Sequence, residues 1–403
     1  MNTSRTILCV DIGSSALKAA LIDSGGHCLG FVREAYPQER ITRGLVDGSD
    51  WEKSLSAAAG ELAKQEPALK PDALCISGNG PTLVPVTHAG EALEPLHWYT
   101  NQAKGSGPSL FIPHAASFLR KNPQGYERTR YLFSAPEWLS FRCGAEAATT
   151  LPSPRYEPYY WDDAQCRESG LDRGKFPPFA PLGSPIGRVS AAAAEYINLP
   201  QGIPVIAGGP DFIMALIGVG AVKPGIVCDR AGTSEGINLC TSGPVYAPGL
   251  RTLPHATGDF WNLAAILPVS GRFFDGYREL TGQTARKYEE LLEELLTKAL
   301  PAASDRALPA GEGLFFPALS FQDGPGTGLF TAGPDLPSRA GLGRAVLEAL
   351  GFLVRDALEL FSGQGFSITE MRLSGGQSKN ARWNQRKADS TGCTLLVPEI
   401  RDG

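Results

Sequence analysis

The chain has 403 residues, of which 42% are hydrophobic and 20% charged, and its formal net charge is -5. The length favours two or three domains, and the composition is that of a globular protein rather than a disordered or collagenous chain. The slight negative charge argues against a surface that binds nucleic acid or an anionic membrane, so the predicted partner is a small molecule.

The eight cysteines are scattered and form no CxxC pairs. This pattern predicts buried thiols in a reducing cytoplasm rather than a disulfide-stapled secreted domain. Residues 1–6 contain no apolar signal core, and no window approaches the roughly 18 apolar residues of a membrane span. We therefore expect a cytoplasmic protein.

Four apolar runs are predicted strands. Residues 7–10 lead through a Gly-Ser-Ser turn into residues 17–23, a pattern typical of a β-hairpin. Residues 73–77 and 203–207 are further buried strands, each followed by a glycine-containing turn. With helices between them, these strands predict an α/β layer.

Three stretches have helical signals. Ser49 and Glu52 have the spacing of a capping box, so Ser49 is the expected N-cap of a helix. The predicted buried face of this helix includes Leu55, Ala59 and Leu62. Residues 285–300 have an amphipathic pattern, and residues 342–362 form a long apolar helix that is expected to end at Gly363.

Residues 100–185 are rich in prolines and aromatic side chains and have little periodicity. Two interpretations are open for this stretch: an inserted lid, or irregular surface.

The sequence contains a short internal repeat. Residues 7–15 and 226–234 are both apolar strands that enter a Gly-Ser-Ser or Gly-Thr-Ser turn. The repeat predicts two related halves, each with one hairpin, which could hold a polyphosphate from both sides. Arg230 stands in the second copy where the first has Asp11. Only the first half is therefore expected to hold a metal.

Gly13, Ser14 and Ser15 form a turn that suits a phosphate, because backbone N–H groups and hydroxyls are donors and glycine permits close approach. Such turns also occur in ordinary hairpins. Asp11 favours the phosphate interpretation, since a carboxylate at the end of an apolar strand needs donors or a cation. Magnesium bridged through water to phosphates is the expected cation. Lys18 either approaches phosphate or lies on an exposed face.

Asp211 follows a Gly-Gly-Pro turn and begins an apolar helix. One interpretation is an acidic residue stabilised by a helix N-terminus. The other is a general base that accepts a proton from a substrate hydroxyl as it attacks a γ-phosphate.

Gly375 and Gly376 follow a predicted strand and form a third turn at which a nucleotide can lie against the backbone. Other nucleotide and metal motifs have no support in the sequence. It contains no GxxxxGK[ST] loop, no GxGxxG turn after a strand and no HExxH motif, which argues against a P-loop enzyme, a Rossmann dehydrogenase or a zinc hydrolase.

Taken together, these motifs resemble the FGGY carbohydrate kinase family, and the resemblance covers nearly the whole chain, from Leu8 to Pro398. Four segments match in the family's order: the first phosphate motif at 11–15 with Lys18, the catalytic-aspartate turn at 208–211, the second phosphate motif at 221–234 and the adenosine motif at 375–389. Four motifs in this order are a more specific sign of the family than any single motif.

The resemblance implies an α/β fold of two ribonuclease-H-like domains, as in actin, Hsp70 and the sugar kinases, with ATP and sugar in the cleft between them. The expected N-terminal domain is residues 1–224, with the sugar site, the first phosphate motif and the catalytic aspartate. The expected C-terminal domain is residues 225–403, with the second phosphate and adenosine motifs, and it stops short of the family's usual end.

The resemblance also implies a role for each motif residue. Asp211 would be the general base, and Asp11 would hold Mg²⁺ through water. The implied nucleotide contacts are Gly13, Ser14, Ser15, Lys18, Gly232, Thr233, Gly375, Gly376 and Asn380. The implied sugar contacts are Asn79, Gly80, Trp98, Asp211 and Phe212.

The expected reaction is ATP-dependent phosphorylation of a sugar or polyol, with a ketopentose such as xylulose as the first candidate. Glycerol is disfavoured, because residues 98–102 lack the aspartate and arginine of the family's pattern. The sequence is compatible with a homodimer and leaves the oligomeric state open. Two alternatives are open: a nucleotide-binding sensor or structural ATPase of the actin and Hsp70 group, and a degenerate kinase that binds ATP without sugar turnover.

Overall fold

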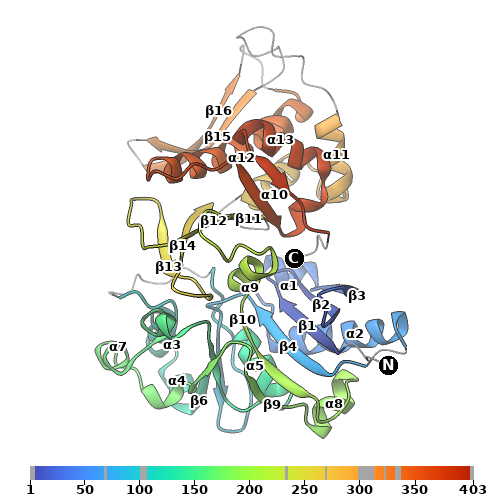
Figure 1. Ribbon diagram of the computed structural model, residues 1–403, viewed down its shortest axis with the longest axis vertical. Helices are drawn as coiled ribbons and strands as arrows, with labels where there is room; N and C mark the ends of the chain where they lie inside the picture. Colours follow the sequence, from blue (N-terminus) through green and yellow to red (C-terminus); the bar gives the residue numbers. More distant parts are fainter. Residues whose placement is uncertain are drawn as a thin grey trace. The chain divides into compact units, whose positions relative to one another are not determined.

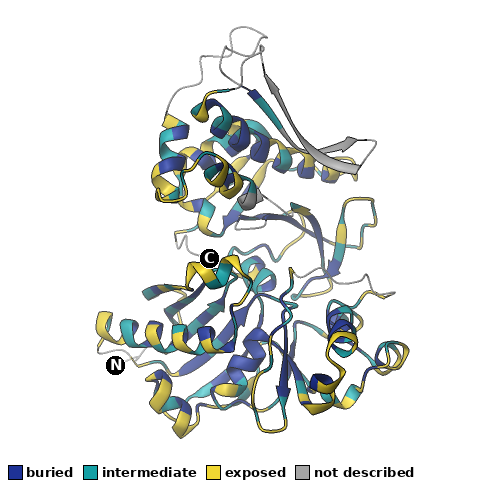
Figure 2. Ribbon diagram, turned by 180° about the vertical axis from the view of Figure 1, so that it is seen from behind, coloured by how far each residue is buried: buried dark blue, intermediate teal, exposed yellow. Residues whose placement is uncertain are grey.

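The computed structural model divides the chain into two compact units, Met1–Met214 (unit 1) and Ala215–Gly403 (unit 2). It describes residues 5–67, 70–99, 107–231, 235–267, 270–297, 313–321, 324–331 and 337–399. Each unit contains one six-stranded mixed sheet with helices packed on it (Figure 1). The sheet strands are largely buried, whereas the outer faces of the helices are exposed (Figure 2). Among the described helices, none combines the length and apolar character needed to cross a bilayer.

The sheet of unit 1 has the strand order β3-β2-β1-β4-β10-β9. Its strands are β1 (Thr6–Ile12), β2 (Ala16–Asp23), β3 (Cys28–Ala35), β4 (Ala73–Gly78), β9 (Pro185–Arg188) and β10 (Pro204–Pro210). β1 and β2 form the predicted antiparallel hairpin, which confirms that prediction. β4 is parallel to both β1 and β10, so the carboxyl ends of three neighbouring strands lie at one edge of the sheet.

Helix α2 (Gly48–Gln65) packs against β2 and β3. It buries the three predicted side chains, Leu55, Ala59 and Leu62. The predicted N-cap is wrong: the cap is Asp47, whose carboxylate accepts the Ser49 N–H at 2.9 Å. The helix begins earlier because Asp50 accepts the Asp47 N–H at 3.0 Å and completes the capping box. Glu52 instead pairs with Arg142 at 2.6 Å.

The described part of the aromatic stretch, residues 107–185, is packed rather than irregular surface. Tyr156, Tyr160 and Trp161 are each at most 3% exposed. The ring of Trp161 lies 4.7 Å from that of Phe176 and 5.4 Å from that of Phe111, measured between centroids. The surface interpretation is therefore wrong for these three aromatic residues. Periodicity is weak here because the aromatic side chains come from many short elements.

The remaining elements of unit 1 are α1 (Gln38–Thr42), β5 (Leu83–Thr87), α3 (Ile112–Lys121), α4 (Pro123–Arg128), β6 (Thr129–Ser134), α5 (Ala135–Arg142), β7 (Thr149–Leu151), η1 (Pro154–Tyr156), α6 (Glu157–Tyr160), α7 (Asp163–Glu168), η2 (Arg173–Lys175), β8 (Phe179–Pro181) and α8 (Ala191–Ile197). β5 pairs with β6, and β7 with β8. Helix α9 (Asp211–Gly218) follows β10 and contains the boundary between the units, ten residues before the expected boundary at residue 224.

The sheet of unit 2 has the order β13-β14-β12-β11-β17-β18. Its strands are β11 (Val227–Ala231), β12 (Glu235–Thr241), β13 (Arg251–Pro254), β14 (Trp261–Leu267), β17 (Glu370–Ser374) and β18 (Thr394–Leu396). β11 is antiparallel to β12 and parallel to β17, as β1 is to β2 and β4. Arg230 lies opposite Ser374, as Asp11 lies opposite Ser77. The predicted repeat is therefore confirmed in the topology of the two sheets.

The remaining elements of unit 2 are α10 (Ser270–Leu280), α11 (Tyr288–Thr297), β15 (Gly313–Phe321), β16 (Gly324–Thr331), α12 (Arg339–Ser362), η3 (Gly376–Lys379) and α13 (Ala381–Thr391). α11 and α12 confirm the two predicted helices. α12 begins before residue 342 because the Ser338 hydroxyl accepts the Gly341 N–H at 3.0 Å. Gly363 is its C-cap but keeps a right-handed φ of -61°, and the left-handed residue is Gly365 with φ +87°.

All eight cysteines are free thiols. Five are buried as predicted: Cys143, Cys166, Cys228, Cys240 and Cys393. The prediction is wrong for Cys9, Cys28 and Cys75, which are half-buried. Cys9 is more exposed than Leu8 and Val10 because side chains alternate between the two faces of a strand.

The stability of the protein is expected to depend on pH through Glu137, which lies in the first turn of α5. Burial raises the pKa of Glu137 from 4.5 to about 7, against the opposing effect of N–H donors from Ser134 at 2.9 Å and Thr150 at 2.8 Å. Because the folded-state pKa lies above the unfolded value, the protonated form of Glu137 favours the folded state. This contribution to stability is complete below about pH 4.5 and is lost as the pH rises through about 7.

We therefore expect the melting temperature of wild type, relative to Glu137→Gln, to fall between about pH 5 and about pH 8. Thermal denaturation of both proteins across this range measures the difference between their melting temperatures. The titrations of all other groups affect both proteins equally and cancel in this difference. Glu61→Gln, at an exposed ion pair with Lys64, should give a difference that hardly varies with pH. A difference between wild type and Glu137→Gln that stays constant would contradict the expectation.

Candidate active site

The predicted site residues of unit 1 meet at the carboxyl edge of its sheet. Ile12, Gly78 and Pro210 are in register across β1, β4 and β10. The next residue of each strand therefore leaves the sheet at the same level, within about two strand spacings, or roughly 10 Å. The predicted phosphate hairpin at residues 13–15, the turn that begins at Asn79 and helix α9, which begins at Asp211, thus share one edge.

The hairpin between β1 and β2 is tight. The Gly13 N–H donates to the Ala16 carbonyl at 3.0 Å, and a Cβ on Gly13 would lie 2.9 Å from that oxygen. Asp11 and Lys18 are cross-strand partners, with 3.4 Å between Oδ2 and Nζ, and their side chains are 30% and 26% exposed. Lys18 thus lies beside the carboxylate at the base of the turn, in a partly solvated pair of modest energy.

A chain of hydrogen bonds ties the predicted sugar turn to the hairpin. The Thr82 hydroxyl donates to Asn79 Oδ1 at 2.7 Å and accepts the Trp98 N–H at 3.3 Å. The Trp98 indole then donates to Ser14 Oγ at 3.3 Å. Because Ser14 accepts this bond, its own O–H can donate elsewhere. Thr82 was not predicted from the sequence, and its place two residues after Gly80 is the only local signal.

The position of Asp211 is determined by close packing of β10 on β4. A Cβ on Gly208 would lie 2.0 Å from the Ile76 carbonyl, and the Ser77 hydroxyl donates to the Gly209 carbonyl at 2.8 Å. Asp211 is half-buried at the N-terminus of α9, and its Oδ1 accepts the Phe212 N–H at 2.6 Å. A carboxylate there is favoured by the helix dipole.

The predicted adenosine turn lies in unit 2. Gly375 has φ +91°, and a Cβ there would lie 2.2 Å from the Ala231 carbonyl, so the turn packs against the end of β11. A Cβ on Gly376 would meet nothing within 4 Å. Asn380 Oδ1 accepts the Trp383 N–H at 2.9 Å as the N-cap of α13. Asn380 therefore has a structural role, whatever it contacts in addition. Gly232 and Thr233 lie outside the described residues.

Asp11 can supply only one of the several ligands that a magnesium ion needs. Within the ranges that the structure describes, no cluster of three His, Cys, Asp or Glu side chains could hold a metal. Mg²⁺ needs no such cluster where phosphates and water complete its shell. A half-exposed carboxylate beside the phosphate turn suits this outer role.

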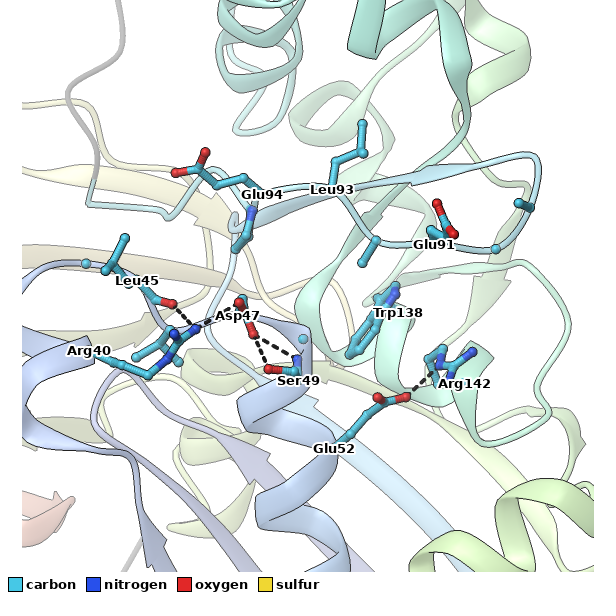
Figure 3. A pocket seen from close by; sticks show the side chains of 17 residues that line it. Arg40, Leu45, Asp47, Ser49, Glu52, Glu91, Leu93, Glu94, Trp138 and Arg142 are labelled. Carbon is cyan, nitrogen blue, oxygen red and sulfur yellow. Dashed lines mark hydrogen bonds and ion pairs between the residues drawn. The ribbon is translucent and has the colours of Figure 1, made fainter.

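Unit 1 also has an open cavity of about 700 Å³ between the start of α2, residues 89–95 and α5 (Figure 3). None of the predicted site residues lines it. Its two guanidinium groups are already neutralised: Arg40 pairs with Asp47 at 2.8 Å, and Arg142 pairs with Glu52. We therefore assign the site to the strand ends rather than to this cavity.

Parts of this chain are similar in sequence to known proteins. The chain is 24% identical over 309 residues to an autoinducer-2 kinase of Salmonella paratyphi A, covering 72% of this chain and 58% of that protein. It is 30% identical over 235 residues to an L-fuculokinase of Salmonella typhi, covering 57% of this chain and 47% of that protein. The chain thus spans about half the length of these curated relatives.

The fold is that of a solved xylulose kinase from Rhodospirillum rubrum, with a TM-score of 0.74 and 17% identity over 98% of this chain and 87% of that one. Residues 230–403 match the C-terminal domain of the FGGY family of carbohydrate kinases. The repeated hairpins and the two sheets are those that the family resemblance implied. The chain thus shares its fold with a sugar kinase, and its residues 230–403 belong to the FGGY family of carbohydrate kinases.

Proposed function

We propose that this chain is an ATP-dependent carbohydrate kinase that phosphorylates a hydroxyl of a ketose, with a ketopentose such as xylulose as the first candidate. The supporting observation is the common edge of β1, β4 and β10. It gathers a phosphate-compatible hairpin, a polar turn and a carboxylate at a helix N-terminus within one unit.

In the proposed reaction, Asp211 accepts the proton of the sugar hydroxyl that attacks the γ-phosphate of ATP. The backbone of residues 13–15 and the Ser14 hydroxyl donate to phosphate oxygens, and Lys18 supplies positive charge. A bound magnesium ion would neutralise phosphate charge, with Asp11 holding its water shell. The residues of the proposed adenosine site are Gly375, Gly376 and Asn380, with Gly232 and Thr233 on the second phosphate turn.

Two observations favour a ketose as acceptor. The relatives include proteins named as kinases of L-fuculose and xylulose. In addition, the Asn79–Thr82–Trp98 hydrogen bonds hold polar groups beside the phosphate hairpin, which suits a polyhydroxylated substrate. We assign Asn79, Gly80, Trp98 and Phe212 to this sugar site together with Asp211.

A panel of ketoses, aldoses and polyols, assayed for ADP release in the presence of ATP and Mg²⁺, tests the proposal. We expect turnover that depends on the sugar and is greatest with a ketopentose. ATP binding without turnover of any acceptor would contradict the kinase assignment and favour a nucleotide sensor.

The proposed metal role of Asp11 gives a separate prediction. Asp11→Asn should raise the Mg²⁺ concentration for half-maximal activity by about 10-fold, because the variant loses the charge that holds the hydrated ion. A magnesium titration of the steady-state rate measures this. Asp23→Asn, at the opposite end of β2, should leave the titration unchanged. Equal magnesium dependence of wild type and Asp11→Asn would contradict the assignment.

A further inference from the structure

Three charged side chains are buried together in unit 2. Asp229 on β11, Glu235 on β12 and Lys387 on α13 are each at most 1% exposed. Lys387 Nζ donates to Asp229 Oδ2 at 2.7 Å and also to Glu235 Oε1. The ammonium lies 5.7 Å from the centre of the Trp383 ring. One lysine therefore joins both strands of the second hairpin to helix α13.

The first hairpin shows that the fold does not require these charges. Ala231 pairs with Glu235 in unit 2 and Ile12 pairs with Leu17 in unit 1, so Leu17 stands where unit 2 has Glu235. Two residues before each of these strand ends, Val10 stands where unit 2 has Asp229. Val10 and Leu17 are ordinary core residues, 3% and 0% exposed. Since a buried ion pair seldom adds net stability over apolar residues of similar volume, the three charges need another explanation.

The two carboxylates depend strongly on the lysine. Among the described residues, Asp229 Oδ1 and Glu235 Oε2 have no hydrogen-bond partner. Burial raises the pKa of Glu235 above its usual range, the lysine opposes this rise, and the neighbouring Asp229 adds to it. A buried network of this kind is favourable only in the arrangement that keeps its charges paired, so it can specify one position of β11 and β12 against α13.

We propose that Lys387 is a positioning residue for nucleotide binding, an inference that rests on the proposed kinase function. Asn380, the last residue of the proposed adenosine turn, is the N-cap of α13, and Gly375 in the same turn packs against the Ala231 carbonyl at the end of β11. By pairing with both Asp229 and Glu235, Lys387 holds β11 and β12 against α13 and so fixes the backbone of this turn.

The test compares two variants of the full chain. Lys387→Met leaves two buried carboxylates without their cation and should lower the melting temperature. The triple variant Asp229→Val, Glu235→Leu, Lys387→Met puts the side chains of the first hairpin into the second, and should fold with a melting temperature near that of wild type. Lys287→Met, at a lysine whose side chain is 79% exposed, is the matched control.

Titration calorimetry with ADP is the decisive measurement, at a temperature where every variant is folded. We expect the triple variant to bind ADP at least 10-fold more weakly than wild type, while its KM for the sugar changes less than two-fold. Lys287→Met should bind ADP as wild type does. Wild-type ADP affinity in the folded triple variant would overturn the positioning role, and so would the absence of ADP binding by wild type. ADP binding without sugar turnover would overturn only the proposed function.

Discussion

Replacing Asp211 by alanine is expected to lower the rate of sugar-dependent ADP formation by about 10²- to 10⁴-fold. The proton of the attacking hydroxyl would then have no carboxylate acceptor. Asp211 directly follows Pro210, the residue of β10 that is in register with the ends of β1 and β4, so its removal is expected to change the chemistry without disturbing the hairpin at residues 13–15. ADP release under saturating ATP and sugar measures the effect as a loss of kcat.

Two controls separate the base from a structural role. Asp211→Asn keeps the size of the side chain and an oxygen that can accept the Phe212 N–H, but it cannot take up a proton at neutral pH. It should be as inactive as Asp211→Ala and should melt near the wild-type temperature. ADP affinity should be unchanged in both variants. Undiminished sugar-dependent activity in either variant would exclude Asp211 as the base.

Replacing Gly375 by alanine is expected to destabilise unit 2 by about 2 kcal/mol or more. Its φ of +91° and ψ of +170° lie in a region that only glycine enters readily. The added Cβ would also lie 2.2 Å from the Ala231 carbonyl, a backbone atom that cannot rotate away. The melting temperature of unit 2 should fall by about 5 °C or more.

Gly376→Ala is the matched control, because a Cβ there meets no atom within 4 Å. Its melting temperature should stay close to that of wild type. If a nucleotide lies against this turn as proposed, Gly376→Ala should still weaken ADP binding, whereas Gly375→Ala should lose both stability and binding. Equal melting temperatures for the two variants would contradict the packing argument.

Local patterns in the sequence predicted β1, β2, β4 and β10, the hairpin at residues 13–15, the buried face of α2 and the start of α9. Apolar runs, glycine turns and helical spacing act over a few residues, so they can be recognised without the fold. The repeat of residues 7–15 at 226–234 extended this to the topology of both sheets. The N-cap of α2 was misplaced, because Asp47 and Ser49 are both good caps and only the backbone decides between them.

Contacts between distant residues were decided by the tertiary structure alone. Thr82 joins Asn79 to Trp98 only because the turn after β4 folds back on itself. Lys387 meets Asp229 across 158 positions of sequence, and nothing local in α13 indicates a buried charge. Burial and pairing of such groups depend on which strands are neighbours, and strand order is a property of the whole chain. The sequence alone thus predicted a site at the strand ends, and the structure showed which side chains hold those strand ends in place.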